Sequence, residues 1–375
     1  MRVLICPDKF AGTLTAVEAA GAIARGWSRA APGDETDERP LADGGPGFLD
    51  VIAATAGGSR VPVPTVDPLG RPVPGEVLVL GQTGYLESAQ ACGLHLLVPA
   101  ERDPKTTTSY GLGVLVAGAV ERGVRELVIG LGGSGTNDAG AGMLAALGAA
   151  PLDAAGYALP YGGAALLAAA TLGGVPRMRG VQLVAATDVD NPLTGLTGAT
   201  AVYGPQKGAT REDVLLLDRA LGTFAEVLER GLPTCPPDLA QVPGAGAAGG
   251  LGAALLALGG RAVSGLGLVR ELTGLDKALD AVDLVITGEG SFDDQSLRGK
   301  VVSGVAAGAR DRGLPCVVLA GRSSAGRREA AAAGVSETYT LVEHLGSVER
   351  AMAEPAEGLV DLAGRVARQW SRPSK

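Results

Sequence analysis

Short apolar runs alternate with helical patterns at both ends of the chain. Residues 3–6 form an apolar run that predicts a strand, and residues 15–29 repeat their apolar positions with the period of a helix. Thr15, followed three positions later by Glu18, has the capping-box pattern of a helix start. Towards the other end, strands are expected at residues 284–287, 316–320 and 338–342, with a helix near 301–312. Such alternation predicts a parallel sheet that both ends of the chain build together.

The middle of the chain has a different pattern. Residues 61–86 are interrupted by prolines and alternate apolar with polar positions, which predicts antiparallel hairpins. Further helices are expected at residues 110–122 and 212–230, and further strands at 126–129 and 181–186. We therefore expect an α/β fold with two domains. Residues 1–60 and 278–375 would form a Rossmann- or flavodoxin-like parallel-sheet domain, and residues 61–277 an inserted α/β domain with antiparallel hairpins and glycine-rich loops.

Composition and charge exclude several classes of protein. The chain has 375 residues, a net charge of −8 and only two histidines. An acidic chain lacks the basic surface of a nucleic-acid binder, and so few histidines argue against zinc sites and Ser-His-Asp triads. The four cysteines are scattered, and no apolar stretch is long enough for a membrane helix. We expect a cytoplasmic protein with reduced thiols.

Glycine occupies 59 positions, and many of these follow predicted strands. The clearest case is the segment 130–135, which follows the strand expected at 126–129. A glycine loop between a strand and a helix offers backbone N–H groups to an anion, although plain tight turns are the alternative interpretation. Segments 130–135 and 244–249 match GxGxxG, but neither is followed by a strand that ends in an acid about 20 residues later. The Walker A pattern is absent.

Carboxylates follow several of the same strands. Asp8, Asp43, Asp188, Asp190, Glu289, Asp293 and Asp294 all lie at or just after predicted strand ends. In an open α/β sheet the carboxyl ends of the strands border the ligand crevice. Together with Lys207 and Lys300, these carboxylates suit Mg²⁺-assisted phosphoryl transfer. For any single acid, a solvated loop charge or a helix cap is the competing explanation.

A series of motifs in one order resembles the bacterial type I glycerate kinase family over essentially the full length. The motifs are PDKFAGTLTA (7–16), ADGGPG (42–47), ESAQACGL (87–94), TTSYGLG (107–113), IGLGGSGTNDAGAGM (129–143), TDVDNPL (187–193), YGPQKGA (203–209), PGAGAAGGLGAAL (243–255) and TGEGSFDDQS with GK at 299–300. The resemblance implies two α/β domains that flank a cleft. It also implies ATP-dependent phosphorylation of D-glycerate, in this type commonly at the 2-hydroxyl, with Mg²⁺.

The chain departs from the family pattern in four motifs. The usual PDSFKGSL has a lysine where this chain has Ala11, and GEGRIDSQS has an arginine where it has Ser291. Polar family positions are also replaced by Pro46, Phe48, Leu112 and Val114. We hypothesise that the nucleotide and phosphate machinery is kept while the acceptor pocket is altered, because unpaired polar groups in a pocket are costly. The acceptor would then be D-glycerate or a related hydroxy acid.

These considerations assign roles to named residues. We expect Asp188, Lys207 and Lys300 to be catalytic, with Asp188 as the general base because it ends a strand. Candidates for substrate binding are Asp8, Lys9, Asp43, Gly44, Gly45, Ser109, Asn137, Asp138 and Asn191. Candidates for nucleotide binding are Gly132, Gly133, Ser134, Gly244, Gly246, Gly249, Gly288, Glu289 and Gly290. Candidates for metal binding are Asp188, Asp190, Glu289 and Asp293.

The expected partners are ATP and a small hydroxy acid, with no nucleic acid and no membrane, and a homodimer is left open. Two other functions stay open at this point. A catalytically weak or inactive homologue could bind a nucleotide or a small acid without turnover, which the eroded motifs favour and the intact TDVDNP and GPQK oppose. A dinucleotide oxidoreductase is disfavoured by the missing ribose-binding acid.

Overall fold

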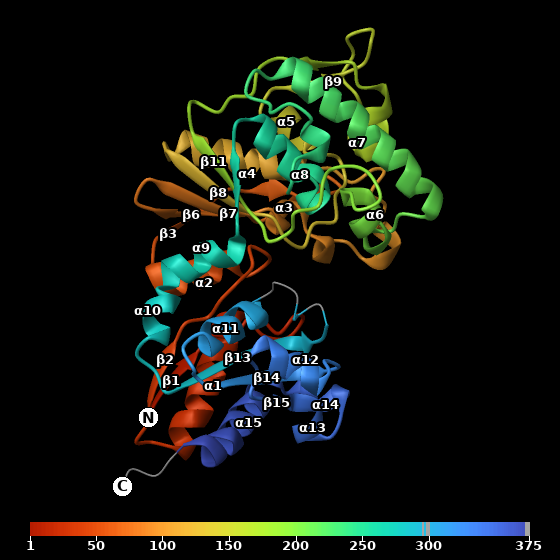
Figure 1. The fold of residues 1–375 in the computed structure, drawn as a ribbon. Helices are drawn as coiled ribbons and strands as arrows, with labels where there is room; N and C mark the ends of the chain where they lie inside the picture. Colours follow the sequence, from red (N-terminus) through yellow and green to blue (C-terminus); the bar gives the residue numbers. More distant parts are fainter. Residues whose placement is uncertain (295, 298–300, 372–375) are drawn as a thin grey trace. The chain divides into compact units, whose positions relative to one another are not determined.

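The computed structural model describes residues 1–294, 296–297 and 301–371 (Figure 1). Its contacts divide the chain into two compact units. Unit 1 contains residues 1–43, 50–57 and 266–375, and unit 2 contains residues 44–49 and 58–265. Both units are α/β with parallel strands, which confirms the expected fold class. That residues 61–277 fold as a separate inserted domain remains a prediction.

Unit 1 is built on a five-stranded sheet in which every neighbouring pair is parallel. Its strands, in spatial order, are β15 (Glu337–Thr340), β14 (Cys316–Ser323), β13 (Leu284–Phe292), β1 (Arg2–Ile5) and β2 (Glu35–Glu38). The sheet therefore combines strands from both ends of the chain, as the alternating pattern predicted. β13 runs to Phe292, five residues beyond the strand that the sequence predicted.

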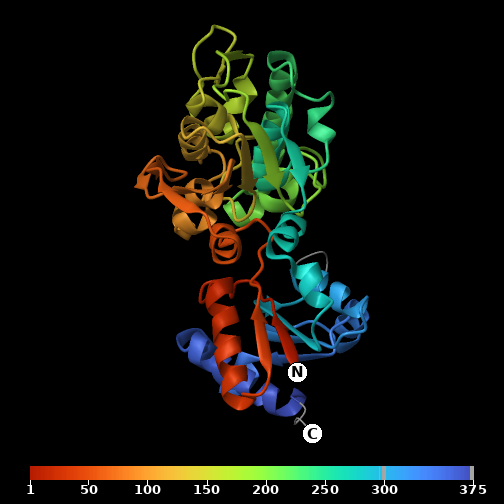
Figure 2. The same ribbon diagram turned by 90° about the vertical axis from the view of Figure 1, so that its left-hand side faces the viewer.

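Helices α1 (Ala16–Ala30) and α15 (Pro355–Trp370), from opposite ends of the chain, pack side by side (Figures 1 and 2). They share a buried core with alternate residues of the strands, among them Val3 and Ile5 of β1. Thr15 caps α1 by accepting a hydrogen bond from the backbone N–H of Glu18, so the predicted capping box is confirmed. The other helices of this unit are α9 (Gly265–Thr273), whose first residue is assigned to unit 2, α10 (Leu275–Leu279), α11 (Val301–Arg310), α12 (Arg327–Ala333), α13 (Leu341–Leu345) and α14 (Val348–Ala353).

The strand expected at 338–342 was extended too far. β15 ends at Thr340, and α13 begins at Leu341. The side chain of Thr340 accepts a hydrogen bond from the backbone N–H of Glu343, which starts the helix. Leu341 and Val342 continue the apolar pattern of the strand, but the cap at Thr340 starts a helix there instead.

Unit 2 is built on a six-stranded mixed sheet. Its strands, in spatial order, are β12 (Arg261–Val263), β11 (Gln182–Ala186), β8 (Glu126–Gly130), β7 (Thr83–Glu87), β6 (Glu76–Leu80) and β3 (Ser59–Pro62). The first four are parallel, whereas β6 and β3 pair antiparallel, as the proline-rich segment predicted. Two short antiparallel pairs lie outside the sheet, namely β4 (Thr65–Val66) with β5 (Pro72–Val73) and β9 (Ala150–Leu152) with β10 (Thr171–Gly173).

A large apolar core stabilises unit 2, with Leu112, Ile129 and Phe224 among its fully buried side chains. Its helices are α3 (Ala89–Cys92), α4 (Tyr110–Glu121), α5 (Ala141–Ala146), α6 (Ala199–Tyr203), α7 (Arg211–Gly231) and α8 (Ala247–Ala257). Helix α2 (Phe48–Ala56) is divided, because residues 48–49 are assigned to unit 2 and residues 50–56 to unit 1. Among the described residues, no helix is long and apolar enough to cross a membrane.

Candidate active site

Four parallel strands of unit 2 bring their carboxyl ends to one edge of the sheet. Asp188 lies two residues beyond β11, and Ser264 directly follows β12, the neighbouring strand. The Ser264 hydroxyl donates a hydrogen bond to Oδ1 of Asp188 over 2.6 Å. Asp188 is nevertheless an exposed residue. Asp190 is also exposed, two residues further along the same loop.

The glycines of the ADGGPG motif lie against the same strand ends. Gly44 has a φ of +89°, and a Cβ there would lie 2.8 Å from the carbonyl oxygen of Ala186, the last residue of β11. A Cβ on Gly132 would similarly meet the backbone of Gly45. These glycines therefore allow two backbone segments to approach closely, one after β8 and one before α2. Together these glycines form a tightly packed backbone layer at the end of β11, two residues before Asp188.

Glu87, the last residue of β7, fixes the position of that layer. Its Oε1 accepts hydrogen bonds from the backbone N–H groups of Gly47 and Leu49, at 3.0 and 2.8 Å. These N–H groups lie at the start of α2, where a carboxylate is favoured by the helix dipole. Sequence reasoning did not select Glu87, although a carboxylate at a strand end was the signal used for the other acids.

Lys207 is buried inside unit 2, with 1% of its surface exposed. It lies in the 3-10 helix Pro205–Lys207, and its Nζ donates to Oγ of Ser134 at 2.9 Å and to the carbonyl oxygen of Thr136 at 2.7 Å. Burial lowers the pKa of its ammonium group to about 8, and the negative charge of Asp138 acts in the opposite direction. Lys207 therefore stabilises the loop after β8 through these two hydrogen bonds from the interior of unit 2.

Asp138 and Ser109 form a second buried support of the same loop. The Asp138 carboxylate accepts hydrogen bonds from the backbone N–H and hydroxyl of Ser109 and from the N–H groups of Gly140 and Gly142. Burial raises the pKa of this carboxyl, and those hydrogen bonds oppose the rise. Both side chains are fully buried, so they support the loop after β8 from the interior of unit 2. Their expected contact with substrate remains a prediction.

Two buried polar atoms in this loop have no hydrogen-bond partner among the described residues, Oγ1 of Thr136 and Oδ1 of Asn137. The other end of the Asn137 amide donates from Nδ2 to Oγ1 of Thr200 at 2.9 Å. A buried polar atom without a partner normally has a water or a ligand nearby. Asn191, by contrast, uses both ends of its amide, because Nδ2 donates to the carbonyl of Thr197 and Oδ1 accepts from the Tyr203 hydroxyl.

The glycine segment 244–250 packs around this loop. A Cβ on Gly249 would overlap the carbonyl oxygen of Thr136 and approach Nζ of Lys207, and one on Gly246 would overlap the carbonyl of Pro192. Ala248, Gly249 and Gly250 all have positive φ, at 53°, 71° and 89°. This left-handed stretch places the backbone against the carbonyl of Thr136 and the ammonium group of Lys207. Gly244 also has a positive φ but meets no atom closer than 3.7 Å.

Unit 1 has its own group of predicted site residues at the carboxyl ends of its strands. Nζ of Lys9 lies 3.9 Å from Oδ1 of Asp8 and 3.9 Å from Oδ1 of Asp43. Gly288, Glu289 and Gly290 are part of β13 rather than of a loop, and a Cβ on Gly288 would overlap the carbonyl of Leu319 in β14. Asp293 follows β13, where its carboxylate accepts from the N–H of Ser296. Lys300 lies outside the described residues.

The four predicted metal ligands fall into two pairs. Asp188 and Asp190 belong to unit 2, and Glu289 and Asp293 belong to unit 1. Among the described residues, no group of three or more acidic, histidine or cysteine side chains is arranged to hold a metal ion. Mg²⁺ in phosphoryl-transfer sites is commonly held by one or two carboxylates together with substrate phosphates, so a single pair is compatible with it.

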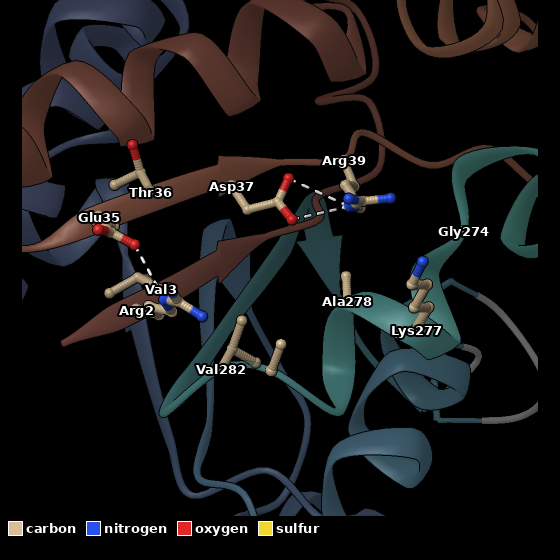
Figure 3. Close-up of a pocket in the computed structure, with 11 residues that line it drawn as sticks. Arg2, Val3, Glu35, Thr36, Asp37, Arg39, Gly274, Lys277, Ala278 and Val282 are labelled. Atoms are coloured by element: carbon tan, nitrogen blue, oxygen red, sulfur yellow. Dashed lines mark hydrogen bonds and ion pairs between the residues drawn. The ribbon is translucent and has the colours of Figure 1, made fainter.

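Two of the cavities in unit 1 adjoin its sheet. The larger, of about 520 Å³, lies against the first residues of β1, along β2 and beside α10. Its charged walls are largely paired, since Arg2 contacts Glu35 and Arg39 contacts Asp37 (Figure 3). This cavity is away from the carboxyl ends of β1 and β13 and contains none of the predicted site residues. A second cavity, of about 320 Å³, adjoins those carboxyl ends.

Comparisons with known proteins agree with the motif pattern. The model of the glycerate kinase family matches residues 3–371. A glycerate kinase from Bacillus subtilis (strain 168) is 40% identical over 95% of this chain and 94% of its own length. Glycerate 2-kinase from Escherichia coli (strain K12) is 39% identical over 94% of this chain and 93% of its own. A crystal structure of a glycerate kinase 2 candidate from Salmonella typhimurium LT2 has a TM-score of 0.80, 38% identity and 98% coverage of both chains.

The α/β fold, with carboxylates and glycine segments at the carboxyl ends of parallel strands, defines a small-molecule kinase, that is, a phosphotransferase with an alcohol acceptor. The match over nearly the whole chain narrows this class. The chain belongs to the glycerate kinase family.

Proposed function

We propose that the protein transfers a phosphoryl group from ATP to the 2-hydroxyl of D-glycerate and releases 2-phosphoglycerate. Family membership and two relatives named glycerate kinase and glycerate 2-kinase support this reaction. The structural observation that carries it is the Asp188 carboxylate, which is exposed at a strand end and oriented by the Ser264 hydroxyl. A cytoplasmic location and the oligomeric state remain predictions.

Asp188 has the position and chemistry of the general base. An exposed carboxylate can accept the proton of the substrate hydroxyl as that oxygen attacks the terminal phosphorus of ATP. The hydrogen bond from Ser264 restricts the rotation of the carboxylate. Positioning of this kind is a large part of phosphoryl-transfer catalysis.

Lys207 acts in this proposal as a positioning residue. Its ammonium group is already engaged by Ser134 and Thr136 and is almost completely buried. Its charge lies beneath the loop of residues 132–137, where Oγ1 of Thr136 and Oδ1 of Asn137 are buried without a hydrogen-bond partner among the described residues. A positive charge beneath such a loop favours phosphate groups above it.

The residues present are compatible with Mg-ATP. Asp188 and Asp190 would hold Mg²⁺, which when bound offsets the charge of the phosphate oxygens. Neither side chain is buried, so both carboxylates can reach a hydrated ion. The metal itself remains part of the proposal.

The motif departures give less support to an altered acceptor than the sequence suggested. Phe48 and Leu112 are fully buried, and Phe48 packs edge-on against Tyr85. Leu112 belongs to the apolar core of unit 2, and Phe48 packs outside that cluster, so the apolar character of both side chains serves packing. Pro46 packs near Gly133. Ala11 and Ser291 line the cavity of about 320 Å³. Because the buried Phe48 and Leu112 serve packing rather than an acceptor pocket, we favour D-glycerate itself over a larger hydroxy acid.

A coupled assay of ADP release tests the proposal. The wild-type chain should turn over D-glycerate and release 2-phosphoglycerate, which NMR distinguishes from the 3-isomer. Asp188→Asn should lower kcat by about 10²-fold or more, which is the usual contribution of a general base. Asp361→Asn, at an exposed site on α15, is the matched control and should be unchanged. Wild-type turnover in Asp188→Asn would remove this residue from its role, and absence of ADP release with D-glycerate would reject the function.

A further inference from the structure

The parallel sheet of unit 1 changes its winding direction between β1 and β13. From β1 the chain passes through α1 to β2 on one side, and from β13 it passes to β14 and β15 on the other. In open α/β sheets, ligands bind outside the carboxyl ends of the strands at such a switch point. A binding site is therefore expected just beyond Ile5 and near Gly288.

The cavity of about 320 Å³ lies beside this point. It is lined by Phe10 and Ala11 after β1, by Ser291 of β13 and by Arg322 of β14. Val348 and Met352 of α14 also line it. These two side chains are 46% and 55% exposed, although they are apolar. Exposed apolar side chains that line a cavity indicate a surface that a ligand covers.

The polar groups of this cavity are few and suited to a flat ring. Arg322 is exposed, and its Nε donates to Oγ of Ser291 at 3.2 Å. A guanidinium group held in this way can stack on an aromatic ring. β14 continues through Gly321 to Ser323, whereas its last pair with β15 is Ala320 with Thr340. The edge of β14 beyond that pair offers backbone groups to the polar edge of a base.

Charge distinguishes the two substrates of the reaction. Ala11 and Ser291, which line the cavity, carry no charge. Arg322 is the one charged residue among the described lining residues of this cavity. Glycerate is a small anion without apolar surface, and it would leave most of such a cavity unfilled. A nucleobase is neutral, flat and aromatic, and it matches the apolar lining.

We propose that this cavity binds the purine base of ATP, with Arg322 stacked on the ring and the phosphates directed towards the switch point. The inference rests on the proposed function, because it assumes ATP as phosphoryl donor. It assigns base recognition to unit 1, where Gly290 is the one lining residue that the sequence had already selected for nucleotide binding.

Filling the cavity tests this assignment. Ala11 is exposed, so Ala11→Trp adds a large side chain to the cavity without a change in the core. Binding of a ribose-labelled fluorescent ADP, measured by anisotropy, should weaken at least tenfold. KM for ATP should rise by a similar factor, while kcat and KM for D-glycerate stay within about twofold. Ala331→Trp, at an exposed position of α12 that does not line the cavity, is the matched control.

The outcomes separate this inference from the proposed function. Wild-type affinity of Ala11→Trp for the labelled ADP overturns the cavity assignment, even if D-glycerate is phosphorylated. Nucleotide binding by the wild-type chain without turnover of D-glycerate rejects the proposed function. The affinity of Ala11→Trp for the labelled ADP still tests the cavity assignment in that case. A wild-type chain that binds no labelled ADP overturns the cavity assignment as well. If circular dichroism shows that Ala11→Trp is unfolded, Met352→Trp introduces an indole into the same cavity from α14 and decides the question.

Discussion

The hydroxyl of Ser264 donates to the carboxylate of Asp188, and the two residues follow neighbouring parallel strands. The register pairs Val263 of β12 with Ala186 of β11, which brings Ser264 alongside the start of the Asp188 loop. The hydrogen bond therefore depends on strand pairing rather than on the local turn. Ser264 is a positioning residue for the proposed base.

Replacement of Ser264 by alanine should lower kcat without a change in nucleotide affinity. A hydrogen bond to a charged group contributes about 1.5–3 kcal/mol, which corresponds to roughly a ten- to hundredfold fall in kcat if it is needed only in the transition state. Ser264→Thr keeps the hydroxyl and should retain most activity. Steady-state kinetics with both substrates measure the effect. A rise in KM for ATP with unchanged kcat would show that Ser264 contributes to binding instead.

The buried lysine gives a pH dependence of stability. Burial lowers the pKa of Lys207 from 10.5 to about 8, so between pH 8 and 10.5 the unfolded chain binds a proton at this site that the folded chain does not. The unfolding free energy contributed by this group should therefore rise with pH in that window, by at most about 3 kcal/mol. Urea unfolding of wild type and Lys207→Met at pH 7.5, 8.5 and 9.5 measures the difference. Parallel curves for the two proteins would contradict the shifted pKa.

Much of the fold of unit 1 could be predicted from the sequence because the patterns that indicate its strands and helices are local. The alternation of apolar runs and helical periods, and the Thr15–Glu18 capping box, need no knowledge of distant residues. The break between β15 and α13 was missed because Leu341 and Val342 fit either element. Thr340 decides between them through a single hydrogen bond.

The candidate site could be predicted only in part from the sequence, because its geometry depends on residues that are far apart in the chain. β12 has three residues, of which Arg261 and Ala262 are exposed, so it has no apolar run and was not predicted. Ser264 was missed for that reason. Lys207 was found through its motif, but its burial beneath Ser134 follows from packing across more than 70 residues of sequence. Sequence alone gives residue types and cannot show which side of a loop they occupy.

Glu87 should be replaceable by glutamine but not by alanine. Its Oε1 accepts from the N–H groups of Gly47 and Leu49, and glutamine keeps an acceptor oxygen at that position. Glu87→Ala leaves both donors without this partner and should cost about 1–3 kcal/mol of stability, together with activity that depends on the Gly44–Gly45 segment. Urea unfolding and the coupled assay measure both quantities. An equal loss in Glu87→Gln would indicate that the negative charge at the start of α2 matters more than the hydrogen bonds.

A pair of glycine substitutions separates backbone strain from close packing. Gly249 and Gly70 both have positive φ, at +71° and +82°, so alanine is strained at either position. Nothing lies within 4 Å of a Cβ on Gly70, whereas a Cβ on Gly249 would overlap the carbonyl of Thr136 and approach Lys207. Gly70→Ala should therefore cost about 1–2 kcal/mol of unfolding free energy and leave kcat unchanged.

Gly249→Ala should cost more than the control, roughly 3 kcal/mol or above, because the Thr136 carbonyl must move away from Nζ of Lys207. The same displacement should lower kcat in the protein that remains folded, since it moves the loop of residues 132–136. Urea unfolding gives the stability difference, and the coupled assay at a temperature where both variants are folded gives kcat. Equal costs for the two variants would mean that strain alone accounts for Gly249, and that the loop tolerates a side chain beneath it.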